Sequence, residues 1–259
     1  MSLDQGSGFV KRQSTVADAF LGGRLVVAQP KNGFRAGFDS VVLGAAVSRK
    51  AQTLLELGAG AGVPSLVALA LNPGLSATLV EFDATVLPLT ASNLKDNGFA
   101  ERSRVITADL TQPANRTAAG LMSDSYMSAI ANPPFFDPAM GSDASAERRL
   151  ARQMPNDLLD TWARAAATHV APGGEAIFIH VPQSLPSLLA SFTHRFGAIT
   201  ILPLAPRAGE AAIRILIRGI KGSRAPLQLL ATRVLHDDTG RGFAPEFEAI
   251  FRGSAALDW

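Results

Sequence analysis

Residues 131–136 contain the side chains whose types best fit a chemical step, in the run Asn132-Pro133-Pro134-Phe135-Phe136. The two prolines stiffen this turn and leave its carbonyls without local N–H partners. The Asn132 side-chain oxygen and the Pro133 carbonyl can therefore accept both hydrogens of a planar amino group. Such acceptors favour a pyramidal nitrogen with an available lone pair, which makes an aromatic or amide NH2 nucleophilic. Phe135 offers a ring face on which a flipped-out base can stack.

A second feature is a glycine loop, Gly58, Gly60 and Gly62, preceded by Glu56. Glycine lacks a Cβ and lets bare backbone approach a ligand. The dinucleotide-binding pattern needs a third glycine where this chain has Val63.

Acidic residues follow the glycine loop along the chain. Glu81 stands 19 residues past Gly62, and Asp109 comes later, after another β-rich run. Carboxylates accept hydrogen bonds from hydroxyl or amino groups and disfavour phosphate, so a nucleoside ligand fits better than a pyrophosphate. Each feature alone has a structural alternative, namely a tight turn, a solvated strand end or a Pro-rich surface turn. Their occurrence in strand order favours a ligand site.

These residues need strands and helices to position them. From residue 53 the chain alternates β-rich and helical stretches, which predicts an α/β fold with a doubly wound, mostly parallel sheet of seven strands. Residues 1–50 lie outside this alternation and are predicted to form an N-terminal cap, with the catalytic domain over 51–259. The seven predicted strands cover residues 53–57, 76–82, 104–108, 127–131, 176–181, 199–204 and 212–218, and a further strand is predicted over 227–235. Helices are predicted from Pro64, over 84–97, 156–169 and 187–195, and from Pro245, with a turn at 172–174.

Composition excludes several classes of protein. The chain has 259 residues, of which 47% are hydrophobic and 18% charged, so it is neither disordered nor a coiled coil. It has no cysteine, which excludes disulfides, thiolate nucleophiles and Cys-ligated metal centres. Its four histidines show no metal-ligand spacing, and we expect no metal. We see no leader or membrane-spanning segment and expect a cytoplasmic protein.

The basic residues are unevenly distributed although the formal net charge is only +2. Between Arg195 and Arg224 there are six basic residues and one acid, Glu210. In residues 212–218, Ile213, Ile215 and Ile217 alternate with Arg214 and Arg218. A basic face suggests an anionic partner such as RNA, and a solvated surface is the alternative.

Glu56 to Val63, Glu81, Asp109 and Asn132 to Phe135, in this order, resemble class I S-adenosylmethionine-dependent methyltransferases of the amino-group-modifying (NPPY/F) type. The segment 33–43, Gly-Phe-Arg-Ala-Gly-Phe-Asp-Ser-Val-Val-Leu, and the distal Phe243-Ala244-Pro245-Glu246 and Arg252-Gly253 resemble the bacterial tRNA(1,Val) adenine-N6 methyltransferases. Those enzymes modify the adenine just 3′ of the anticodon. The resemblance covers about residues 20–255.

The resemblance implies a Rossmann-like methyltransferase fold and a role for each matching residue. It assigns Glu56, Gly58, Gly60 and their loop to the methionine moiety and ribose, Glu81 to the ribose hydroxyls and Asp109 to the adenine amino group. Asn132, Pro133 and Phe135 would act at the target base, with Asn132 also contacting the cofactor. Gly37 and Asp39 would close over the methionine end.

For an RNA substrate, Phe136 with Arg148, Arg149 and Arg152 would contact the nucleic acid. The chain departs from the pattern at Met127, where an Asp is common, and at Phe135, where adenine enzymes commonly have Tyr.

Other functions are compatible with some of these motifs. The same turn serves glutamine N5 methylation in release factors and guanine N2 methylation in rRNA. The large N-terminal helical domain usual in the glutamine-methylating enzymes has no room in 50 residues, and the guanine enzymes often have His where this chain has Phe136. A non-catalytic cofactor-binding module conflicts with the intact Asn-Pro-Pro-Phe turn. An NAD-dependent dehydrogenase conflicts with Val63 and the acid-lined site.

Overall fold

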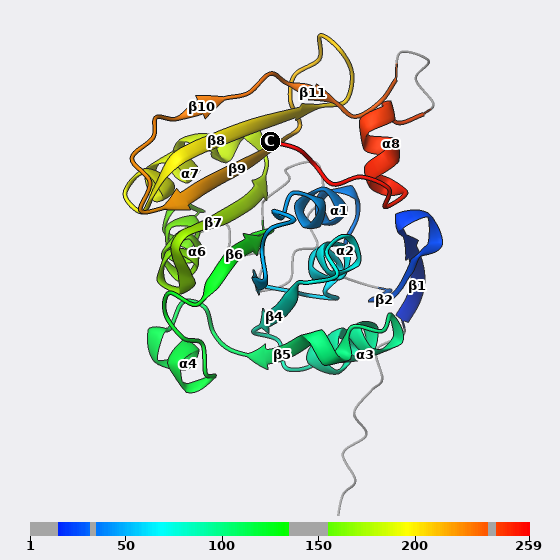
Figure 1. Ribbon diagram of the computed structural model, residues 1–259, viewed down its shortest axis with the longest axis vertical. Coiled ribbons are helices and arrows are strands. Elements are labelled where there is room, and N and C mark those ends of the chain that lie inside the picture. The colour runs from blue at the N-terminus through cyan, green and yellow to red at the C-terminus, as the bar shows by residue number, and fades with distance from the viewer. Residues whose placement is uncertain (1–14, 32–34, 135–154, 238–241) are drawn as a thin grey trace, which may run out of the picture.

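The computed structural model describes residues 15–31, 35–134, 155–237 and 242–259. Within these residues a sheet of nine strands runs through the molecule in the order β10-β8-β9-β7-β6-β3-β4-β5, with β11 also paired to β8 (Figure 1). Strands β3 to β7 run parallel to one another, and β9 is antiparallel to both β7 and β8. The strand bounds are β3 Thr53–Leu57, β4 Ser76–Glu81, β5 Ser103–Thr107, β6 Tyr126–Ala131, β7 Val170–His180, β8 Phe196–Ala205, β9 Arg214–Lys221, β10 Gln228–Leu229 and β11 Arg233–Val234.

The sheet is mostly parallel as predicted, but it has nine strands where the sequence predicts seven. The predicted strand over 227–235 is present as two-residue pieces, β10 and β11, each of which pairs with β8. The predicted turn at 172–174 lies inside β7. There the register against β6 shifts, and Gly173 takes φ of +81°, so the glycines form an irregularity within a strand.

Helices cover both faces of the sheet. One face carries α1 Phe38–Ala45, α2 Val63–Leu71 and α3 Leu87–Asp96, and the other carries α6 Pro155–His169 and α7 Leu185–Thr193. The remaining helices are η1 Leu21–Gly23, η2 Ala100–Arg102, α4 Pro113–Ala118, η3 Pro182–Ser184 and α8 Pro245–Phe251. Among the residues described, no helix is long and apolar enough to cross a membrane.

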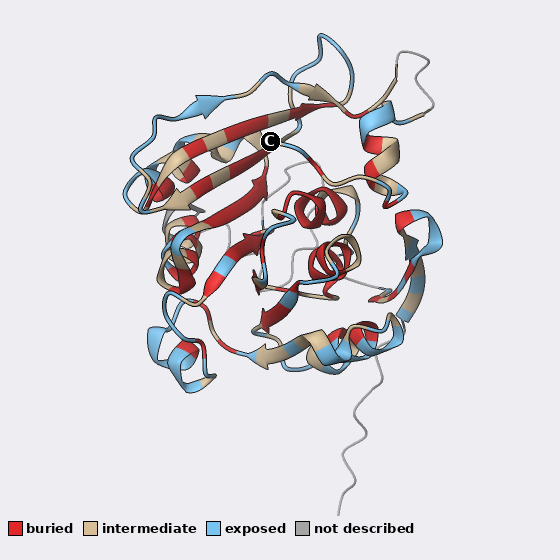
Figure 2. Cartoon of the chain, in the orientation of Figure 1, coloured by how far each residue is buried: buried red, intermediate tan, exposed pale blue. Residues whose placement is uncertain are grey.

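Side chains of the central strands contribute to two apolar cores, one on each face of the sheet. On β3, Leu54 packs toward α1 and α2, whereas Leu55 and Leu57 pack toward α6. On β7, Ile177 and Ile179 join the first core and Phe178 the second. The central strands are therefore buried on both faces, as Figure 2 shows, which is typical of a parallel sheet between two helix layers.

The N-terminal region does two different things. Strands β1 (Thr15–Phe20) and β2 (Leu25–Pro30) form an antiparallel hairpin. This hairpin lies against α3, where Asn93 donates to and accepts from the Ala28 backbone. Helix α1 instead packs on α2 and on the sheet, so close to α2 that a Cβ on Gly44 would lie 2.3 Å from the Pro64 carbonyl oxygen. Of the region predicted to form a cap, residues 15–30 thus form a hairpin on the helices and residues 38–45 a helix on the sheet, and a cap over the site stays a prediction.

Candidate cofactor and catalytic site

The residues singled out in the sequence meet at one edge of the sheet. Strands β5, β4, β3 and β6 are neighbours and parallel, so their carboxyl ends lie side by side. The glycine loop follows β3, Glu81 ends β4, and Asn132 follows β6. Asp109 comes two residues after β5. In open α/β sheets this is the edge where ligands bind.

The glycine loop bends sharply, with φ of +68° at Gly58, +51° at Gly60 and +83° at Gly62. These are left-handed conformations that side chains rarely adopt. A Cβ on Gly58 would lie 2.4 Å from the Trp162 ring, whereas a Cβ on Gly60 would meet nothing within 4 Å. Packing of α6 therefore requires glycine at position 58, whereas the space beside the Gly60 Cα is open at this edge of the sheet.

Glu81 holds this loop against β4. Its Oε2 accepts the Gly60 N–H at 2.8 Å, and its Oε1 accepts the N–H groups of Phe82 at 2.9 Å and Asp83 at 3.0 Å. A carboxylate offers about four lone-pair sites. One site is therefore left for a further donor, and a ligand presenting two hydroxyls must displace a backbone donor to bond with both.

The Asp109 carboxylate has more hydrogen-bond acceptor sites left than that of Glu81. Its Oδ1 accepts the Thr111 N–H at 2.8 Å and the Thr111 hydroxyl at 2.6 Å, which closes a turn after β5. No described residue donates to its Oδ2. The half-buried carboxylate can thus accept a hydrogen bond from a ligand amino group.

Glu56 lies beneath the loop rather than on its open side. The residue is 2% exposed, and its Oε2 accepts the Ser65 N–H at 3.1 Å in the first turn of α2. Burial, with a smaller contribution from the Glu81 charge, raises the pKa of Glu56 to about 8, against hydrogen bonds from Ser65. Glu56 therefore carries a proton at neutral pH and ties the strand to the helix, and its contact with a cofactor stays a prediction.

Asn132 provides a polar atom whose partner is missing. Its Oδ1 is buried and has no hydrogen-bond partner among the described residues. Pro133 is buried, and Pro134 is exposed. A buried carbonyl-type oxygen without a donor costs free energy, and a ligand N–H would relieve that cost. Phe135, Phe136, Arg148, Arg149 and Arg152 fall outside the described residues.

The predicted N-terminal contacts reach the same edge. Gly37 precedes α1, and Asp39 lies in the first turn of that helix. The Asp39 carboxylate accepts the Arg214 Nε–H at 2.9 Å, which ties α1 to the start of β9. Burial raises the pKa of Asp39, and Arg214 opposes that rise.

Two residues at this edge were missed by sequence reasoning. Phe82 directly follows Glu81 and is 66% exposed, which is unusual for a phenylalanine and gives a ligand ring a face to stack on. An aromatic residue directly after a strand-end acid was the available signal. His180 ends β7, and burial lowers its pKa to about 4, so its ring is neutral. A single strand-end histidine gives little signal in a sequence.

Arg214 and Arg218, predicted to form a basic face, are neutralised by carboxylates distant in sequence. Arg214 binds Asp39, and Arg218 binds Glu175 at 2.7 Å. Arg195, Arg207 and Lys221 also have acidic partners. Of the six basic residues from Arg195 to Arg224, five are thus ion-paired. Helices α1 and α6 and strand β7 bring distant acids to three of them, Lys221 pairs with Asp124 before β6, and Arg207 pairs with the nearby Glu210.

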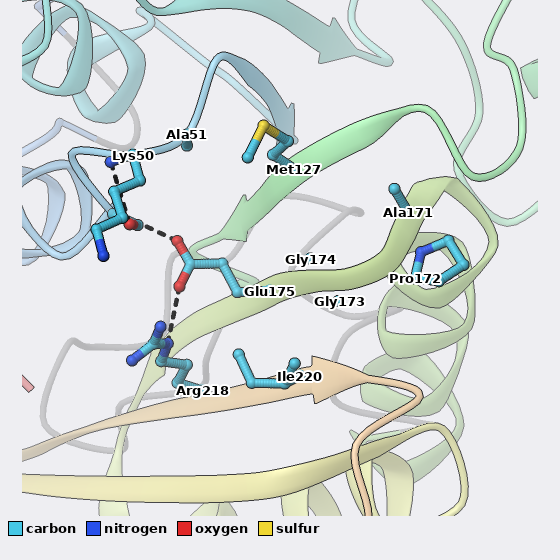
Figure 3. A pocket seen from close by; sticks show the side chains of 11 residues that line it. Lys50, Ala51, Met127, Ala171, Pro172, Gly173, Gly174, Glu175, Arg218 and Ile220 are labelled. Carbon is cyan, nitrogen blue, oxygen red and sulfur yellow. Dashed lines mark hydrogen bonds and ion pairs between the residues drawn. The ribbon is translucent and has the colours of Figure 1, made fainter.

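A cavity of about 330 Å³ lies at the opposite edge of the sheet, around the start of β6 and the end of β9 (Figure 3). Met127 lines it, and Glu175 occupies it between the Ser48 N–H and Arg218. Both Glu175 oxygens are engaged by these partners. The cavity is therefore separate from the residues gathered at the carboxyl ends of the strands.

Comparison with known proteins identifies relatives of this arrangement. Residues 38–179 match the family model of the methyltransferase small domain. A crystal structure of a predicted O-methyltransferase, protein Atu636 from Agrobacterium tumefaciens, is 30% identical and superposes with a TM-score of 0.73, over 85% of this chain and 98% of that one.

A more distant structure is the S-adenosylmethionine-dependent methyltransferase SibL in its apo form. It is 14% identical and has a TM-score of 0.51, over 71% of this chain and 55% of that one, which shows a shared fold. No curated protein matches the sequence.

Proposed function

This chain belongs to the methyltransferase small domain family, and from that membership we propose that it methylates an exocyclic amino group of a nucleobase, adenine N6 in a tRNA. The family implies S-adenosylmethionine as the methyl donor. That cofactor, when bound, supplies an electrophilic methyl group on its sulfonium. The chemistry left to the protein is to hold the donor, orient the amine and stabilise its developing charge.

The residues at the carboxyl edge fit such a cofactor. Gly60 leaves open space at the loop, Glu81 has one acceptor site left for a ribose hydroxyl, and Asp109 has a free oxygen for an amino group. The exposed Phe82 ring offers a stacking face. Gly58 and Glu56 shape the loop from below. We assign the donor site to these residues.

The observation that carries the proposal is the buried Asn132 Oδ1, which has no hydrogen-bond partner within the described part of the chain. With the Pro133 carbonyl it can accept both hydrogens of an amino group and keep the nitrogen lone pair available for attack. The amine attacks without prior deprotonation, and neither acceptor takes up a proton: the proton that the nitrogen must lose once it is methylated passes to water. Phe135 would stack on the extruded base, and the arginines 148, 149 and 152 would contact the phosphates.

Oxygen methylation is a second candidate, because the 30% identical relative from Agrobacterium is a predicted O-methyltransferase. A hydroxyl is a weaker nucleophile and benefits from a base. His180 is a poor base at neutral pH, since its pKa is lowered to about 4. Asn132 cannot act as one. We therefore favour an amine as the acceptor.

Two measurements test the proposal. Calorimetry with S-adenosylmethionine and with NAD should show binding of the first alone. Mass spectrometry of nucleosides from the tRNA of a deletion strain should show loss of a methyladenosine, restored by the wild-type gene. The same strain should also be analysed for rRNA nucleosides and for release-factor peptides. If a methylated guanosine, a methylated glutamine or an O-methyl group were missing instead of the methyladenosine, that group would be the acceptor in place of adenine.

Asn132→Ala separates chemistry from binding. We expect turnover to be abolished while the Kd for S-adenosylmethionine changes less than about twofold, because the lost acceptor serves the amine alone. Exposed Asn115, on α4, gives the control Asn115→Ala with normal turnover. If Asn132→Ala methylated the unmodified substrate RNA at a near-normal rate, the turn would be only structural.

A further inference from the structure

The cavity at the amino ends of β6 and β7 is opened by a bulge in β7. Between two register pairs, Met127 of β6 lies opposite residues 171–174, so β7 has more residues than β6 over this stretch. A bulge of this kind bends a strand away from its neighbour, and bulges are common next to active sites. The cavity volume of about 330 Å³ lies within the range of small-molecule pockets. The cavity is therefore large enough for a ligand.

Arg218 is held in one orientation at the wall of this cavity. Its Nε–H donates to Glu175 Oε2 at 2.7 Å, and its guanidinium lies 5.3 Å from the centre of the Trp259 ring. Glu175 is only 3% exposed, and its Oε1 accepts the Ser48 N–H at 2.9 Å. The backbone after α1 thus fixes the buried carboxylate, and the carboxylate fixes the planar guanidinium through one N–H.

The two terminal amino groups of Arg218, Nη1 and Nη2, have no acceptor among the described residues. Other arginines of this protein use these groups within the fold. Arg195 donates from both to Asp160 and from Nη1 also to the Ser191 carbonyl, and Arg102 donates from both to backbone carbonyls. Arg218 therefore differs from them, because the guanidinium is fixed while most of its N–H donors stay available.

Lys50 adds a second cation to the cavity wall. Its ammonium takes part in no hydrogen bond or ion pair within the described part of the chain. Figure 3 shows the Lys50 amine and the Arg218 guanidinium on the same side of the Glu175 carboxylate. These three side chains are the charged ones among the lining residues, so the wall has an excess of positive charge. Oxyanions are the ligands that match such donors.

The rest of the lining is apolar. Ala51, Met127, Pro172 and Ile220 contribute hydrocarbon or thioether surface, and Met127 is 41% exposed although it lies in a central strand. A Cβ on Gly173 would meet nothing within 4 Å, so the bulge itself leaves space. A ligand that fills this cavity therefore needs an apolar body beside its charged group. The phosphate backbone of an RNA instead needs an extended basic surface.

We propose that this cavity binds a small organic oxyanion. Its carboxylate or phosphate would accept hydrogen bonds from the Arg218 Nη groups and the Lys50 ammonium, and its apolar body would contact Met127 and Pro172. Glu175 is the positioning residue that orients Arg218. The cavity lies at the edge of the sheet opposite the candidate cofactor site, so this inference does not depend on the proposed function.

The test uses three probes that share a phenyl ring and differ in the group attached to it, namely benzoate, phenyl phosphate and benzyl alcohol. NMR titration of the full chain would measure each Kd, with the Trp259 indole N–H and the backbone amides of 171–174 as reporters. At least one of the two anions should bind about 10-fold or more tightly than the neutral alcohol, the lower end of the range for hydrogen bonds to charged groups. The ratio of the two anion Kd values distinguishes a carboxylate site from a phosphate site.

Variants assign the binding to this cavity. Arg218→Gln should raise the Kd of the tighter anion about 10-fold and leave that of benzyl alcohol within about twofold. Arg218→Lys can still pair with Glu175 but lacks the Nη groups, so it should weaken the anion similarly while thermal unfolding stays near that of the wild type. Lys50→Gln should raise the Kd about two- to fivefold, since its charge is exposed.

The matched control is Arg233→Gln. Arg233 is also ion-paired, to Glu246, and its side chain is 24% exposed against 26% for Arg218. This variant should leave all three Kd values unchanged.

Several outcomes would overturn the inference. Neither anion may bind, or benzyl alcohol may bind as tightly as both, which would leave an apolar crevice without a role for the cations. An anion Kd that is unchanged in both Arg218 variants would place the anion elsewhere. Displacement of the bound anion by S-adenosylmethionine would make the cavity part of the cofactor site, and displacement by tRNA would make it an RNA contact. Failure of the protein to bind S-adenosylmethionine would overturn the proposed function alone.

Discussion

At the scale of single residues, burial and neighbouring N–H groups decide what each carboxylate of the site does. Glu56 and Glu81 lie at the ends of adjacent strands, yet Glu56 is buried with a raised pKa and Glu81 accepts three backbone N–H groups. The first holds a proton and supports the loop. The second remains an acceptor with one free site. Residue type alone does not distinguish these two roles.

Glu56 makes folding stability depend on pH in a predictable direction. Its ordinary pKa is 4.5 and burial raises it to about 8, so between these values the folded protein holds a proton that the unfolded chain has released. Its contribution to the free energy of unfolding therefore falls as pH rises through this window and levels off above it, by up to about 1.4 kcal/mol per pH unit.

Glu56→Gln should remove this dependence of the unfolding free energy on pH. The stability of the variant relative to that of the wild type should therefore be higher at pH 8–9 than at pH 5. Urea unfolding across that pH range checks it, with Glu101→Gln, at an exposed acid, as the control for a lost charge. Parallel pH curves for Glu56→Gln and the wild type would contradict the raised pKa.

At the scale of elements, the glycine loop that follows β3 is constrained by helices from both layers. Trp162 of α6 packs on Gly58, and Thr90 of α3 donates its hydroxyl to the Gly60 carbonyl at 2.6 Å. The loop is thus held from both faces of the sheet. Its middle residue, Gly60, is the part left open toward a ligand.

The two glycines should therefore respond differently to alanine. Gly60→Ala should cost about 1–2 kcal/mol of unfolding free energy, from its positive φ alone. Gly58→Ala should cost about 1–3 kcal/mol more, because its methyl group would overlap the Trp162 ring. Urea unfolding measures both costs. Equal losses would indicate that α6 yields at Trp162, contrary to tight packing there.

At the scale of the whole molecule, the last residues of the chain stabilise the helix that carries Asp39. The Leu257 N–H donates to the Ala45 carbonyl at 2.9 Å, and the Trp259 Nε1–H donates to the Ala46 carbonyl at 3.0 Å. Trp259 also packs against the Arg218 guanidinium, at 5.3 Å. Carbonyls at the C-terminal end of α1, which lack partners within the helix, are satisfied this way.

Removal of residues 257–259 should lower the free energy of unfolding by about 2–5 kcal/mol, mainly through loss of the buried Leu257 side chain. Trp259→Phe removes the Nε1–H alone and should cost about 1 kcal/mol. Thermal and urea unfolding check both values. A truncated protein as stable as the full chain would show that α1 needs no such support.

Electrostatics at the molecular scale bear on the proposed RNA substrate. Because most basic residues from Arg195 to Arg224 are ion-paired, the proposal relies on Arg148, Arg149 and Arg152. Reversing these three charges should raise the Kd for tRNA and reduce its dependence on salt, while the Kd for S-adenosylmethionine stays the same.

Filter binding across a salt series measures this, with reversal of the exposed Arg49 and Lys50 as the control away from the site. A flat salt dependence in the wild type, or unchanged affinity in the triple variant, would favour a protein or small-molecule substrate.

The sequence by itself determined the alternation of strands and helices and the order of the strand-end residues. These depend on local signals: apolar runs such as residues 53–57, glycines directly after a strand, and prolines after Asn132. The carboxyl ends of neighbouring parallel strands lie together once the sheet forms, so Gly60, Glu81 and Asn132 could be grouped in advance.

Only the tertiary structure decided which charges are paired and which acceptors are left without donors. Arg214 and Asp39 are 175 residues apart, and β9 and α1 bring them together only when the sheet and helix layers are assembled. Burial of Glu56 and of Asn132 Oδ1 likewise depends on both helix layers at once. Ion pairing and desolvation are set by distance in space, which sequence spacing does not record across such separations.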